Sequence, residues 1–269
     1  MLKTKLQIAY KLSIILMILL LIQSLAGIFL DEISLGIDYM SEGIKAQEIR
    51  NLAIVLPIFV SALIFSIKGS IRANLILLGV VYSVLYNNMH MLFGEDYNKL
   101  LMIYILIFFV SVLALVYGFM MIDYQKISEI NLTKKSLVIL VIPVVFFSLI
   151  LFLMYVSQYT VYIFTDEILP LYSGNKDFES LIPKLNFSFI VFPGIISSLW
   201  LFKKKPMGFV LAIIILILGL NLFIVMIIAA VFQSKYLVGG WDLVPLWSVI
   251  TIYSFYALFI ALKSIGNVK

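Results

Sequence analysis

One stretch of the chain carries polar side chains at a spacing that could build a binding site. Tyr82, Ser83, Tyr86, Asn87 and His90 recur every three or four residues within an apolar segment. Because an α-helix completes a turn in about 3.6 residues, these side chains share one helical face. Hydroxyl, amide and imidazole groups on one face both donate and accept hydrogen bonds. The pattern therefore favours a site for a small neutral or amphipathic ligand.

Two further residues complete the predicted ligand-binding set, Asn98 in the loop that follows and Tyr104 in the next apolar segment. Asn88 points away from the shared face and is expected at the membrane interface. His90, the single histidine, is open to three interpretations: an interfacial residue reached by water, a ligand-binding or proton-linked group, or a metal ligand, which a lone imidazole disfavours. No nucleophile, base and orienting group stand together, so no catalytic residue is predicted.

The composition excludes most metal and cofactor chemistry. The chain has no cysteine and one histidine, so thiolate clusters and paired-imidazole metal sites are not expected, and no cofactor is predicted. The acidic pairs Asp31-Glu32 and Asp166-Glu167 could attract a divalent cation. However, adjacent carboxylates project in different directions, so solvated turns are the simpler interpretation and no metal site is predicted.

The elements that must position these residues are membrane helices. The 269 residues are 64% hydrophobic and 12% charged, against about 45–50% and 25% in soluble domains, and the mean hydropathy is +1.15. A soluble enzyme is excluded. Segments long enough to cross about 30 Å of hydrocarbon occur at 9–29, 51–67, 73–93, 100–121, 137–156, 187–202, 207–232 and 245–264. The sequence predicts an all-α integral membrane protein of eight transmembrane helices.

The distribution of charge predicts the orientation. With a cytoplasmic N-terminus, the inner segments hold 13 of the 19 basic residues and the outer segments hold 12 of the 14 acidic residues. Such a bias follows the positive-inside rule. Both termini are therefore expected on the cytoplasmic side of a bacterial plasma membrane. Topology also explains the basic balance, so no nucleic-acid partner is predicted.

The chain contains signs of an internal duplication. Residues 28–33 (IFLDEI) recur as residues 163–168 (IFTDEI), matching at five of six positions. At an offset of 136 residues, Pro57 corresponds to Pro193. The sequence predicts two four-helix repeats, 1–133 and 134–269, within one membrane domain. Because four spans is an even number, the repeats should be parallel and related by a pseudo-two-fold axis along the membrane normal.

The two prolines should disturb the helices that contain them. Proline lacks the backbone N–H, so Pro57 frees the carbonyl of Ala53 and Pro193 frees that of Phe189. Both helices are expected to kink there. The prolines either shape helix packing only or place free carbonyls in a polar cavity.

The first apolar segment has a second interpretation as a cleaved signal peptide. Lys3 and Lys5 precede it, and Ser24-Leu25-Ala26 resembles a small-residue cleavage site. Its length and its counterpart in the second repeat favour a membrane helix.

Two stretches, 86–94 (YNNMHMLFG) and 190–193 (IVFP) with the following 203–209 (KKKPMGF), resemble a family of uncharacterised bacterial polytopic membrane proteins. The resemblance covers most of the chain. In that family an Asp often stands at the positions of Asn51 and Asn186, so this chain departs at both. The resemblance implies a multi-pass membrane fold and brings no activity, substrate or cofactor.

Three functions fit these patterns. The first is binding or transport of a small neutral or amphipathic ligand through an outward-facing pocket lined by the third helix. An ion-coupled pump is disfavoured, because no predicted span contains a charged residue deep in the membrane. The second is a non-catalytic accessory subunit of a membrane complex, whose polar residues serve only helix packing. The third is a membrane-embedded enzyme that uses His90.

Overall fold

The computed structural model describes residues 2–29, 38–94, 99–130, 132–166, 176–234 and 241–265. Within these ranges every regular element is helical. The α-helices are α1 (Leu2–Phe29), α2 (Asp38–Arg50), α3 (Leu56–Ile67), α4 (Ile71–Gly94), α5 (Leu101–Met120), α6 (Tyr124–Ser128), α7 (Lys134–Thr165), α8 (Lys176–Asn186), α9 (Phe192–Phe202), α10 (Pro206–Gln233) and α11 (Val244–Ile265). The short elements are the π-helical turns η2 (Asn51–Val55) and η3 (Phe187–Val191) and the 3-10 turn η5 (Trp241–Leu243).

In the part of the chain that the structure describes, eight helices are long and apolar enough to cross a membrane. This confirms the predicted number of such helices and implies a lipid bilayer environment. Three of them extend well beyond the predicted segments. The fifth ends at Thr165 instead of residue 156, and the other two begin earlier than predicted. The second starts at Glu42 instead of residue 51, and the sixth starts at Leu181 instead of residue 187. Each of these two spans is a composite, because a π-helical turn joins α2 to α3 and α8 to α9.

Both π-helical turns stand just before a proline. Pro57 and Pro193 are the second residues of α3 and α9. Ahead of them, the N–H of Leu56 donates to the carbonyl of Asn51, five residues back. The wider turn keeps the proline ring away from the carbonyl with which it would collide in a regular helix. The disturbance predicted at both prolines thus takes the form of a π turn.

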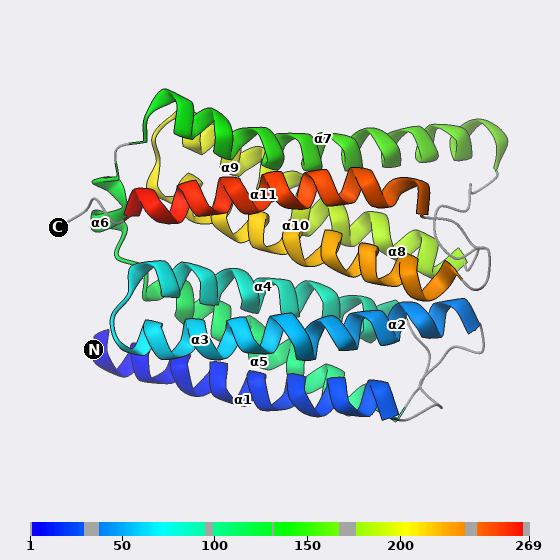
Figure 1. Cartoon of the computed structure of the whole chain (residues 1–269), viewed down its shortest axis with the longest axis horizontal. Helices are drawn as coiled ribbons and strands as arrows, with labels where there is room; N and C mark the ends of the chain where they lie inside the picture. The colour runs from blue at the N-terminus through cyan, green and yellow to red at the C-terminus, as the bar shows by residue number, and fades with distance from the viewer. Residues whose placement is uncertain are drawn as a thin grey trace.

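Figure 1 shows the helices of residues 2–120 grouped together and those of residues 134–265 grouped beside them, and the short α6 contacts α10. Across the boundary, α4 contacts α10, α2 contacts α10, and α4 contacts α8. At the outside of the first group, α1 packs against α5. The start of α1 and the end of α11 lie at the same end of the bundle (Figure 1), as an even number of crossings requires.

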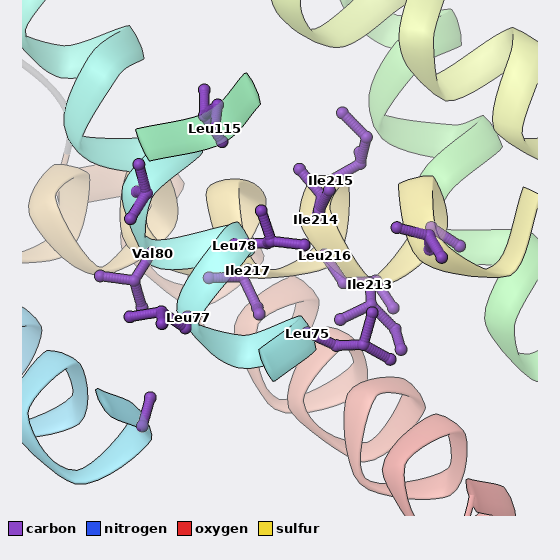
Figure 2. Close-up of a cluster of buried hydrophobic side chains, with 14 of the residues drawn as sticks. Leu75, Leu77, Leu78, Val80, Leu115, Ile213, Ile214, Ile215, Leu216 and Ile217 are labelled. Atoms are coloured by element: carbon purple, nitrogen blue, oxygen red, sulfur yellow. The ribbon is translucent and has the colours of Figure 1, made fainter. Parts of the chain in front are cut away.

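The boundary between the two groups is apolar at its centre. Leu75 and Leu78 of α4 are buried with Ile213 and Ile217 of α10, as Figure 2 shows. Gly79 lets the two helices approach closely, since a Cβ atom there would lie 2.4 Å from Cδ1 of Ile217. The polar contacts that α4 makes across this boundary lie beyond Gly79, at Tyr82 and Tyr86.

Candidate functional site

Two charged side chains lie inside the second membrane-spanning helix. Glu48 is 1% exposed and Arg50 is 0% exposed. At about 1.5 Å per residue, they stand about 9 and 12 Å beyond Glu42, the start of the span. The expectation that no span holds a deep charge was wrong, because α2 continues through η2 into α3 without interruption. Charges at such positions are costly and commonly mark functional sites.

The two charges are joined through an amide. Nε2 of Gln23 donates to Oε1 of Glu48 at 2.9 Å, and Nδ2 of Asn51 donates to Oε2 at 3.0 Å. Arg50 donates from Nη2 to Oδ1 of Asn51 at 2.7 Å and from Nη1 to the backbone carbonyl of Asn221 at 3.2 Å. Asn51 thus presents its nitrogen to the anion and its oxygen to the cation. The network links α1, α2 and η2 to α10.

A glycine on α1 makes room for this network. Gly27 stands one turn after Gln23, and a Cβ atom at Gly27 would lie 2.7 Å from Cγ of Glu48. Any larger residue would push Glu48 away from Gln23. On α1, Gly27 thus leaves space for the Glu48 side chain and Gln23 donates a hydrogen bond to its carboxylate.

A small polar cavity adjoins the network within the first group of helices. Its volume is about 10 Å³, room for about one water. Nε2 of Gln47 and Oδ1 of Asn88 are buried there without a hydrogen-bond partner. One is a donor and the other an acceptor, so a single water fits the chemistry of both. The cavity is lined by Leu20, Gln23, Gln47, Asn51, Val55, Ser83, Val84, Asn87 and Asn88.

A second polar cluster joins α4 to the other group of helices. The hydroxyl of Tyr82 donates to the carbonyl of Phe189 at 2.9 Å. This carbonyl is the one that Pro193 was predicted to free. One turn further, the hydroxyl of Tyr86 donates to Oδ1 of Asn186, whose Nδ2 donates to the hydroxyl of Tyr155. Side chains of α4, α7 and α8 thus meet around one amide.

The predicted ligand-binding residues of α4 divide between these two places. Tyr82 and Tyr86 contact η3 and α8, whereas Ser83 and Asn87 line the small cavity. Ser83 and Asn87 also donate to carbonyls of their own helix, each at 2.8 Å. The His90 ring packs edge-on against Tyr86, with 4.8 Å between centroids. The structure therefore directs the shared face inward but does not gather it around one large pocket.

The remaining predicted positions have different outcomes. Tyr104 is buried with Met91 and Leu100 in a cluster of its own, away from the Tyr82 contact. Asn98 lies outside the described residues. The expectation that Asn88 is interfacial was wrong, because its side chain is 2% exposed and donates to Oε1 of Gln23 at 3.3 Å.

The acidic pairs fall mainly outside the described residues. Of their four members, only Asp166 is described, as the exposed residue that ends α7 with φ of 54°. In the ranges that the structure describes, no group of three His, Cys, Asp or Glu side chains could hold a metal ion.

A sequence signal for the buried charges existed in the spacing of the second span. Glu48, Asn51, Val55 and Phe59 follow one another at three or four residues and are all buried. The inward face of the apolar segment thus continues into a polar stretch. The average hydropathy hides this continuation. It falls where charged residues begin, so the predicted span stops at that point.

Comparison with known protein families, curated proteins and solved structures gives no match for this chain. The eight long apolar helices of the described residues make it a membrane-spanning helical protein.

Proposed function

We propose that this protein is a two-halved membrane carrier for a small neutral or amphipathic solute, closed in the conformation described. The observation that carries the proposal is the set of polar contacts that crosses the boundary between residues 1–133 and residues 134–269. A solute that passes between two halves needs groups at their boundary that can exchange hydrogen bonds with it.

The proposal includes a parallel duplication. Both halves have the order long helix, helix with a π turn and proline, and two further helices. The π turns begin at Asn51 and Phe187, 136 residues apart, and Pro57 and Pro193 have the same separation. Exchange of the halves would turn the α2–α10 contact into the α8–α4 contact, and both contacts exist. These correspondences support a pseudo-two-fold axis along the membrane normal. The proposal also places both termini in the cytoplasm of a bacterial cell, which the charge bias of the sequence supports.

The polar contacts follow the same exchange. Arg50, at the end of α2, donates to α10, and Asn186, at the end of α8, accepts from α4. The residues stand 136 apart and come just before η2 and η3. We call these two contacts latches: the first is Arg50 with the carbonyl of Asn221, and the second is Tyr86 with Asn186. They would hold the outer parts of the halves together and would break when the halves part.

The chemistry of the latches favours an uncharged solute. Tyr82, Tyr86 and Asn186 present hydroxyl and amide groups at the boundary. The charges of Glu48 and Arg50 are already balanced by each other through Asn51. A charged solute would need a countercharge that this network does not leave free.

Cysteine accessibility tests the proposal without knowledge of the solute, since the chain has no cysteine of its own. Asn186→Cys places a thiol in the buried contact with Tyr86, and Met91→Cys places one in a buried cluster whose members all belong to the first half. If the halves part, a charged, membrane-impermeant methanethiosulfonate added outside intact cells should label Asn186→Cys and leave Met91→Cys unlabelled. Absence of label at Asn186→Cys, or equal labelling at both positions, would refute the parting of the halves.

A second function, that of a non-catalytic accessory subunit, is favoured by the packed centre. The polar cavity beside Glu48 holds about 10 Å³, and α4 meets α10 through apolar side chains. A permanently closed boundary in the labelling experiment would support this function. For an enzyme, the edge-on packing of His90 against Tyr86 supplies no nucleophile, so catalysis is not proposed.

A further inference from the structure

A groove on the outer surface of the first half differs in character from the polar network. It lies between α3 and α4 and has a volume of about 390 Å³, within the range of about 300–1,000 Å³ of ligand sites. Its floor is made by Ala62 and Ala73, both buried, and their small side chains leave the space open. The wall residues are Pro57, Ile58, Ser61, Phe65 and Ile76.

The groove is apolar along the helices and basic at one end. Ser61 bonds internally to the carbonyl of Pro57 at 2.8 Å, so its hydroxyl places no unsatisfied donor in the wall. At the end where α3 finishes and α4 begins, the lining includes Ser70 and Arg72. Arg72 is exposed, and the Lys68 ammonium nearby lies 5.6 Å from the centroid of the Phe65 ring. None of the described residues that line the groove carries a carboxylate.

From this arrangement we propose that the groove binds one anionic glycerophospholipid. Both helices belong to membrane-spanning segments that end at this turn, so the groove lies at acyl-chain depth and its basic end at headgroup depth. An acyl chain fills the apolar part, and the lipid phosphate meets the guanidinium of Arg72, which suits phosphate geometry. In the predicted orientation this is the cytoplasmic leaflet, which is the anionic one.

The corresponding turn of the second half is closely packed. Gly208 of α10 stands 136 residues after Arg72 and touches the backbone of α9, since a Cβ atom there would lie 2.5 Å from the nitrogen of Leu201. Closing α9 onto α10 in this way removes the space that an acyl chain needs. Arg72 instead keeps a long cationic side chain at the mouth of an open groove.

Native mass spectrometry of the purified full chain tests this site. Protein extracted from nanodiscs of phosphatidylcholine mixed with phosphatidylglycerol should retain one phosphatidylglycerol per chain in preference to phosphatidylcholine. Arg72→Gln should weaken retention about fivefold, the effect of one basic group near an anionic lipid. Ser61→Trp fills the groove without changing charge and should also remove the lipid. Lys135→Gln, at an exposed lysine of α7 on the same end of the bundle, is the matched control and should bind as the native chain does.

Each other outcome would overturn the proposal. Equal retention of the two phospholipids would show that charge does not select the occupant. Unchanged retention in Ser61→Trp would show that the tail does not enter the groove. An equal loss in Lys135→Gln would reduce the effect to general surface charge. Retention of soluble glycerol phosphate at the same affinity would identify a phosphate site without a lipid tail.

Discussion

Removal of one charge from the buried pair gives the sharpest test of the network. In Glu48→Gln the new amide keeps one acceptor but turns a donor toward either Gln23 or Asn51, both of which donate to the native carboxylate. Arg50 then stays buried without its countercharge. Its guanidinium keeps its proton because arginine is not deprotonated in proteins. The substitution is close to isosteric, so the effect of volume is small.

The expected magnitude follows from the complete burial of both side chains. Breaking a buried ion pair by removing one partner costs about 3–5 kcal/mol, equivalent to a factor of about 10² to 10³ or more in the folding equilibrium. Arg50→Met should cost a similar amount, because it leaves the carboxylate unbalanced. The double variant Glu48→Gln/Arg50→Met carries no net buried charge. It should be less destabilised than the sum of the single variants by at least about 2 kcal/mol.

The free energy of unfolding should be measured for all four proteins by denaturation in mixed detergent micelles, followed by tryptophan fluorescence. Glu129→Gln, at the exposed carboxylate after α6, is the control and should change the free energy by less than about 0.5 kcal/mol. Single variants within about 1 kcal/mol of the native protein would refute the burial argument. Strict additivity of the double variant would show that Glu48 and Arg50 do not act as a pair.

Three further expectations concern packing, the second latch and orientation. Gly79→Val should destabilise the protein by about 1–3 kcal/mol in the same assay, because its first added carbon would overlap Ile217, and an unchanged stability would argue against the close approach of α4 and α10. Asn186→Leu should cost about 1–2 kcal/mol by leaving two tyrosine hydroxyls without their shared amide, and a gain in stability would contradict that network. In intact cells, impermeant maleimide should label Met40→Cys and should reach Lys126→Cys only after permeabilisation, as the charge bias predicts; the reverse result would invert the topology.

Local sequence was sufficient for the features that repeat within a few residues. Eight apolar segments predicted eight membrane-spanning helices, and the 3.6-residue period correctly turned Tyr82 and Tyr86 inward. The missing N–H of Pro193 predicted an available carbonyl at Phe189, and Tyr82 donates to it. Each of these inferences depends on chain geometry over one or two turns, which the amino-acid sequence determines directly.

The tertiary structure decided which polar groups meet. Glu48 is paired with Gln23, 25 residues away, and Arg50 reaches the carbonyl of Asn221 across 171 residues. The hydropathy pattern placed Glu48 and Arg50 in a loop before the second span. A hydropathy average treats every ionised side chain as unfavourable in the membrane, whether or not it has partners there. Glu48 and Arg50 can be buried because the fold brings Gln23, Asn51 and α10 next to them. Each of these partners replaces a hydrogen bond to water that the membrane interior cannot supply.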